Sequence, residues 1–165
     1  MMKSSTKGFT LIELLVVIAI IGILASIVLA SLDTARKKGR DARRVSDLKQ
    51  IQLALELYAD SNNGNFPAVP SGGVAIDTNA TMIAALVTAP NNYIAVIPKD
   101  PQSNSYTYGS VASDGTTACI AGNCAGFVLR SANMESTIPI GDWVGTAGGV
   151  SCVNASPDVN YCVHS

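Results

Sequence analysis

The chain has 165 residues, four cysteines, one histidine and a formal net charge of -1. That length leaves room for one domain beyond a membrane segment, and the absence of a Gly-rich phosphate loop or a Ser-His-Asp set excludes the common catalytic constellations. We therefore expect no enzyme activity, no catalytic residues and no resident metal.

Charge is distributed unevenly along the chain. Most cations lie between Arg36 and Lys49, whereas Lys99 and Arg130 are the only two after Ser61. The same C-terminal part carries six acids, namely Asp77, Asp100, Asp114, Glu135, Asp142 and Asp158. An acidic C-terminal domain makes nucleic acid an improbable partner for that part of the protein.

An apolar stretch of about 24 residues, 9–32, is long enough to cross a bilayer as one helix. Its only charged residue is Glu13, near the N-terminal end, where a carboxylate in hydrocarbon is costly. If the chain is cut after Gly8, Phe9 gains an α-amino group four positions from Glu13. A carboxylate and an amine on neighbouring helices attract each other in a low-dielectric setting, which favours alignment of several copies.

Residues 7–14, Lys-Gly-Phe-Thr-Leu-Ile-Glu-Leu, resemble the processing site of type IV prepilins and of the related pseudopilins of type II secretion. The resemblance implies cleavage between Gly8 and Phe9 by an inner-membrane prepilin peptidase, N-methylation of Phe9, and Glu13 as the assembly carboxylate. The alternative is an ordinary secretory signal cut after residues 28–30, with a mature chain that begins at Ser31. The apolar run is longer than a typical signal, and a signal has no use for Glu13.

Residues 33–61 continue the same helix, because they contain no proline and many helix-favouring residues. An apolar stripe at three- and four-residue spacing should pack on the head: Val45, Leu48, Ile51, Leu55 and Tyr58. We also expect the ion pairs Asp33–Lys37 and Arg43–Asp47. Residues 62–67, Asn-Asn-Gly-Asn-Phe-Pro, should end the helix.

Gly22 and Gly39 are the weak points of this helix. Related pilins often carry a proline after the position of Gly22, where the helix is thought to melt during assembly. This chain has no proline there.

The basic cluster at residues 36–44 allows two interpretations. It either binds anionic lipid headgroups or nucleic acid, or it is a solvated helix face with charge partners on adjacent subunits; we favour the second. The positive-inside rule alone would place the head in the cytoplasm. The leader motif and the cysteines favour a head outside the cytoplasm.

The head, residues 62–165, should contain a short helix over 81–87 and three strands over 105–111, 117–121 and 126–132. Residues 121–123 are expected to form a hairpin turn. The Gly-, Ser- and Asn-rich tail from residue 138 suits a surface loop with no strand that we can assign.

Four cysteines in a small domain beyond a membrane anchor indicate disulfides. Of the three possible connectivities we favour the local pairs Cys119–Cys124 and Cys152–Cys162; free thiols are the alternative. Spacings of four and nine intervening residues fit no common zinc pattern, and the only histidine is His164.

Residues 93–108 also resemble, more weakly, the loop-to-strand region of major pseudopilins, where a step like Pro-Lys-Asp-Pro at 98–101 precedes the first strand. In that family a calcium ion can order the C-terminal loop. Asp114, Asp142 and Asp158 could supply oxygen ligands, but they lack the alternation of a recognisable calcium loop.

Together these features predict an α+β protein with four parts: a leader (1–8), a transmembrane or filament-core half-helix (9–32), an amphipathic half-helix (33–61) and a head with an antiparallel sheet (62–165). The resemblance implies a structural subunit of a type IV pilus-like surface filament, a helical homopolymer whose monomers first lie in the inner membrane. Its partners would be copies of itself, prepilin peptidase, an inner-membrane assembly platform and lipid. The alternatives are a pseudopilin of a secretion or DNA-uptake system, and a membrane-anchored binding module that never polymerises.

Overall fold

The computed structural model describes residues 8–88, 90, 92–132, 134–135, 145–152 and 161–165. The predicted leader, apart from Gly8, lies outside the described residues, as do Asp142 and Asp158. The chain divides into two compact units after Lys37, and each unit is described by itself below.

Helix α1 runs from Leu11 to Ser61 without a break, which confirms the predicted helix to within two residues at its start. Its first half is apolar and exposed on every side, and in the described part of the chain α1 alone is long and apolar enough to cross a membrane. The helix ends at Asn63 and Gly64, both with positive φ (57° and 78°), and the Gly64 N–H donates to the Ala59 carbonyl at 2.8 Å. A left-handed pair at this position satisfies the last carbonyls, as the sequence predicted.

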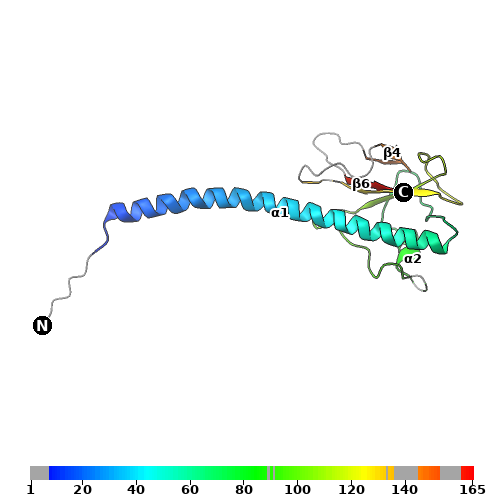
Figure 1. The fold of residues 1–165 in the computed structure, drawn as a ribbon, viewed down its shortest axis with the longest axis horizontal. Coiled ribbons are helices and arrows are strands. Elements are labelled where there is room, and N and C mark those ends of the chain that lie inside the picture. Colours follow the sequence, from blue (N-terminus) through cyan, green and yellow to red (C-terminus); the bar gives the residue numbers. More distant parts are fainter. Residues whose placement is uncertain (1–7, 89, 91, 133, 136–144, 153–160) are drawn as a thin grey trace. The chain divides into compact units, whose positions relative to one another are not determined.

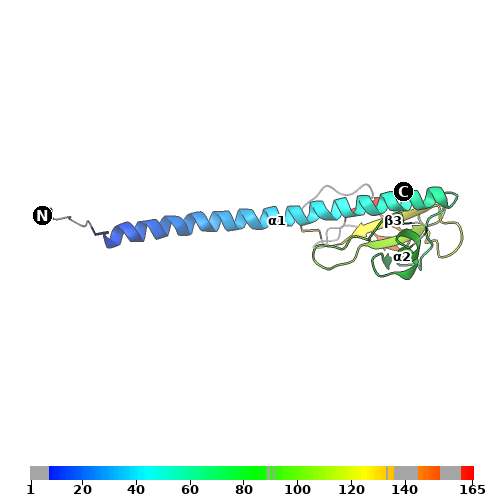
Figure 2. The same ribbon diagram turned by 90° about the horizontal axis from the view of Figure 1, so that it is seen from below.

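The head contains a four-stranded antiparallel sheet in the order β1-β2-β3-β6. The strands are β1 (Val74–Ala75), β2 (Thr107–Val111), β3 (Gly126–Ser131) and β6 (Tyr161–His164). A separate hairpin pairs β4 (Thr146–Ala147) with β5 (Val150–Ser151). Helix α2, Ala80–Leu86, confirms the short helix expected over 81–87, and the Asn79 side chain caps it by accepting from the Met82 N–H. Figures 1 and 2 show the second half of α1 lying along the sheet.

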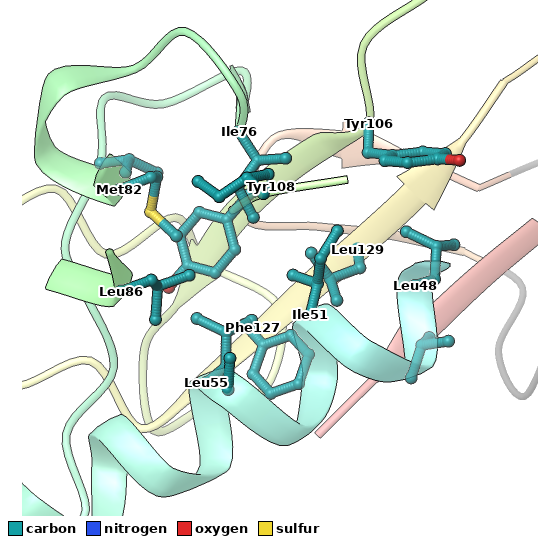
Figure 3. Close-up of a cluster of buried hydrophobic side chains, with 14 of the residues drawn as sticks. Leu48, Ile51, Leu55, Ile76, Met82, Leu86, Tyr106, Tyr108, Phe127 and Leu129 are labelled. Carbon is teal, nitrogen blue, oxygen red and sulfur yellow. The ribbon is translucent and has the colours of Figure 1, made fainter. Parts of the chain in front are cut away.

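The main core fills the space between the second half of α1 and one face of the sheet. Leu48, Ile51 and Leu55 of the predicted stripe are fully buried, and in Figure 3 they face Tyr108, Phe127 and Leu129 of the sheet. Val45 and Tyr58 pack at its margin. The stripe therefore packs against the sheet as predicted, because only this face of the helix can remove its apolar side chains from water.

The opposite face of the sheet carries a second apolar cluster, formed by Val111, Val128, Ala147, Val150, Cys152 and Cys162. The β4–β5 hairpin covers this face, and its turn residues Gly148 and Gly149 both have positive φ. A Cβ on Gly149 would lie 2.2 Å from the backbone nitrogen of Gly72, so the turn approaches its neighbour more closely than any other residue type allows.

Two expectations for the head are wrong. Residues 117–121 are not a strand: Ala118 forms only an isolated bridge with Val111. The disulfide holds the Cα atoms of Cys119 and Cys124 at 5.6 Å although they lie five positions apart, which an extended strand cannot do. The turn at 121–123 therefore closes a disulfide loop rather than a two-stranded hairpin. The tail is also more than a surface loop, since β6 pairs with β3 and buries Tyr161, Cys162 and Val163.

Candidate functional site

The candidate site predicted at the N-terminal end of α1 contains Phe9 and Glu13. Phe9 is 89% exposed. Glu13 Oε2 accepts from the Thr10 backbone N–H at 2.8 Å and from the Thr10 hydroxyl at 2.7 Å, and the Glu13 N–H donates to Thr10 Oγ1 at 3.3 Å. This reciprocal arrangement is a capping box, which satisfies backbone donors at the start of the helix.

The capping box changes the prediction for Glu13. From the sequence we expected this carboxylate to depend on a partner from outside the helix, but Thr10 already gives it two hydrogen bonds within the same chain. Sequence reasoning missed Thr10, although a threonine three residues before a glutamate at a helix start is the usual signature of this motif. What Thr10 does not supply is a positive charge, so an amine would still bind Glu13 favourably.

Two of the six cations of the basic cluster, Arg40 and Arg44, belong to a largely buried ion cluster with Asp41, Asp100 and Glu135. Arg44 is fully buried; its Nε lies 2.5 Å from Asp100 Oδ2, and its Nη1 lies 2.7 Å from Asp41 Oδ1 and 3.3 Å from Glu135 Oε1. Arg40 holds both oxygens of Glu135, at 2.6 and 2.5 Å. Both interpretations of the basic cluster as an exposed surface are therefore wrong for Arg40 and Arg44, because their charges are matched within the head.

Outside the ion cluster, the helix surface follows the sequence prediction. Lys37 pairs with Asp33 at 3.0 Å, and Arg43 lies 3.9 Å from Asp47. Asp47 is also the acceptor for the Tyr106 hydroxyl at 2.7 Å. Both predicted i,i+4 pairs are present.

The ion cluster shifts the pKa values of its members in the directions expected for paired charges. Hydrogen bonds from Arg40 lower the pKa of Glu135 to about 2. Burial alone would raise the pKa of Asp100, but the hydrogen bonds from Arg44 and from the Gln102 N–H outweigh it and lower that pKa. For Arg44, burial opposes the charge, and the bonds to Asp100 and Asp41 more than compensate, so its pKa is raised.

The Pro-Lys-Asp-Pro loop is joined to α1 through Asp100. Its carboxylate accepts from Arg44 and from the Gln102 N–H at 2.8 Å, and Arg44 also donates to Gln102 Oε1 at 2.7 Å. The sequence singled out this loop but gave Asp100 no partner, since Arg44 lies 56 positions away.

Both predicted disulfides are present, with S–S distances of 2.11 Å for Cys119–Cys124 and 2.07 Å for Cys152–Cys162, and no cysteine is free. These bonds exclude the alternative of four free thiols.

Among the described residues no group of three metal-binding side chains lies together. Asp114 accepts from Thr117 and Thr116 of its own loop, and these hydrogen bonds, that of the Thr117 hydroxyl first, lower its pKa to about 2.

The sequence of this chain is similar to those of known proteins. Residues 3–29 match a family model described as the prokaryotic N-terminal methylation motif. The chain is 36% identical over 117 residues to type II secretion system core protein G of Vibrio cholerae, which covers 70% of this chain and 80% of the relative. The protein of the same name from Klebsiella michiganensis is 34% identical over 116 residues (70% and 81% covered), and that from Pectobacterium carotovorum is 36% identical over 101 residues (61% and 64%). No solved structure matches.

The motif, the apolar half of α1 and the small antiparallel sheet define a membrane-anchored α+β protein of the pilin class. Within that class, the chain belongs to the family of type II secretion system core protein G, whose members are structural pseudopilins.

Proposed function

We propose that the protein is a pseudopilin subunit that polymerises through the first half of α1 in a type II secretion system. The observation that carries the proposal is the exposure of every large apolar side chain from Leu11 to Leu32, with Glu13 at the start of this surface. Such a surface needs lipid or other copies of the same helix around it. The surface filament of type IV pilus type is the second candidate, and the names of the relatives favour secretion.

Processing prepares the N-terminal end for assembly. Prepilin peptidase cleaves between Gly8 and Phe9 and methylates the new amine of Phe9. The amine then pairs with Glu13 of an adjacent copy, which retains its Thr10 hydrogen bonds. The Thr10–Glu13 capping box supports this proposal, because it holds the carboxylate in a fixed position at the helix end before a partner arrives.

The membrane and an assembly platform are the other partners of the subunit on its path into the filament. Before assembly the monomer lies in the inner membrane with the first half of α1 in lipid and the head outside the cytoplasm, where its disulfides are stable. An inner-membrane platform adds it to the growing filament. The subunit acts as a structural element without catalysis, and a calcium ion in the head stays a prediction that involves Asp114.

The first test compares filament yield for Glu13→Gln and Glu56→Gln in a host that carries the secretion genes. Glu13→Gln keeps the shape and the capping acceptor but removes the charge, so we expect at least tenfold fewer sheared fibres with normal membrane insertion. Glu56 is an exposed carboxylate on the second half of α1 and serves as the matched control. Equal fibre yield for the two variants would refute the charge-pairing proposal.

The same preparation tests processing. The mass of the purified subunit should correspond to a chain that begins at N-methylated Phe9. A chain that begins at Ser31 would support the signal-peptide alternative, and a chain that keeps its first eight residues in peptidase-positive cells would contradict processing.

A further inference from the structure

Helix α1 changes its surroundings abruptly near Gly39. From Leu11 to Gly39 no side chain of the helix is buried, whereas Asp41 and Arg44, two and five residues later, are fully buried. Gly39 is exposed, and a Cβ built on it would meet nothing within 4 Å. Since glycine is the least helix-favouring residue after proline, Gly39 weakens the helix directly before its first buried turn.

The first buried turn is held by the ion cluster rather than by apolar packing. Arg40, Asp41 and Arg44 bind two segments that are distant in sequence, at Asp100 and at Glu135. Arg40 binds Glu135 through two oxygens, Asp41 accepts from the Glu135 N–H at 3.0 and 3.1 Å, and Arg44 binds Asp100 at 2.5 and 3.3 Å. The first fully buried apolar side chain, Leu48, comes one turn later still.

This turn cannot open without separating several buried charges from their partners. Loss of a partner from a buried ion pair is strongly unfavourable, because the charge that remains is poorly solvated. The turn before it, at residues 36–39, makes no comparable side-chain bonds within the described part of the chain, and its ion pair Lys37–Asp33 is exposed. Two consecutive turns of one helix therefore differ sharply in the cost of local opening.

We propose that α1 opens locally at Gly39 and that the ion cluster stops this opening at Asp41. The cluster is a conformational boundary: the helix can bend or unwind on its N-terminal side while the core around Leu48 and Ile51 stays closed. The boundary belongs to the single chain, so it does not depend on polymerisation or on the proposed function.

Residue-resolved amide exchange by NMR tests the boundary in the full chain in detergent micelles. In the unmodified protein, amides of residues 37–40 should exchange at least tenfold faster than those of residues 44–48. Arg44→Met removes the central charge while it keeps an unbranched apolar side chain. Exchange over residues 41–47 should then rise at least tenfold, with Ile51 and Leu55 unchanged. A boundary that stays at Asp41 in Arg44→Met would overturn the proposal.

Three further variants complete the test. Arg43→Met is the matched control, because the Arg43 side chain is 64% exposed and comes no closer than 3.9 Å to Asp47. The exchange profile of this variant should match that of the unmodified protein. Gly39→Ala should slow exchange over residues 37–40 at least threefold, and an unchanged rate would contradict the weak point. If Arg44→Met fails to fold, Arg40→Gln removes only the outer pair with Glu135 and should still speed exchange at residues 40–43; no change there would count against the boundary.

Discussion

Two charged residues of α1 have partners at very different distances along the chain. Glu13 and Arg44 both lie on α1, yet Glu13 is held by a threonine three positions away and Arg44 by carboxylates 56 and 91 positions away. Thr10 caps the start of α1, whereas the carboxylates that bind Arg44 join distant parts of the head to the second half of α1. A single substitution should therefore act on assembly at Glu13 and on stability at Arg44.

The depressed pKa values of the ion cluster make head stability depend on pH in acid. Glu135 ordinarily titrates near 4.5 and in the folded head near 2, and the pKa of Asp100 is also lowered from 3.8. A group whose pKa is lower in the folded state stabilises the fold fully at pH values above its unfolded pKa. That contribution is lost as the pH falls through its folded pKa. We expect constant unfolding free energy from pH 7 to about 5 and a loss of about 2–3 kcal/mol towards pH 2.

Urea titrations at several pH values, followed by near-UV circular dichroism, measure this loss. Glu135→Gln is the informative variant, because it removes the most strongly shifted carboxylate of the ion cluster. Its unfolding free energy should be lower at pH 7 and should change less between pH 4.5 and 2. A stability that stays constant down to pH 2 in the unmodified protein would contradict the assigned charges.

The sequence predicted ion pairs only where both partners lie about one helical turn apart. The pairs Asp33–Lys37 and Arg43–Asp47 follow from helix spacing and are present. The burial of Arg44 could not be predicted, since a dense basic run on a helix ordinarily faces water and its acidic partners are distant in the chain. Thr10 could have been predicted from its spacing to Glu13.

Elements of the fold were predictable where their signal is local and long. Helix α1, helix α2 and the strands β2 and β3 follow from periodicity and end signals, and they lie within two residues of the predicted bounds. Strand β1 has two residues and β6 has four, too few for a pattern, and both exist because they pair with longer strands. Tertiary pairing, rather than local propensity, determines these edges.

The Cys152–Cys162 disulfide should determine whether β6 stays on the sheet. It joins the residue after β5 to β6, and both of its cysteines belong to the second apolar cluster. With a separation of 10 residues the loop entropy corresponds to roughly 2.7 kcal/mol, against roughly 2.1 kcal/mol for the 5-residue separation of Cys119–Cys124. The double variant Cys152→Ser with Cys162→Ser should therefore lose more stability than the double variant at 119 and 124.

Denaturant unfolding of the two double variants gives this comparison, and amide exchange at Val163 reports directly on β6. We expect Val163 to lose protection only in the 152/162 variant. Equal stability of both variants, with Val163 still protected, would show that the strand pairing with β3 is sufficient by itself.

At the scale of the whole molecule, the two units expose different kinds of surface. In the described part of the chain, sixteen large apolar side chains from Phe9 to Leu32 are exposed, and only five are exposed after Leu32. The second unit has two apolar clusters, two disulfides and the ion cluster of its own. Insolubility should therefore come from the first unit and folding stability from the second.

A chain that begins at Asp33 should consequently be soluble, monomeric and cooperatively folded without detergent. It keeps Asp33–Lys37 at its new start and every contact of the ion cluster, so its melting temperature should lie within a few degrees of that of the full chain in micelles. Size-exclusion chromatography with light scattering and thermal melting measure both properties. Aggregation of this fragment, or a gradual melt, would show that the head depends on the apolar half of α1 for its solubility or its cooperative folding.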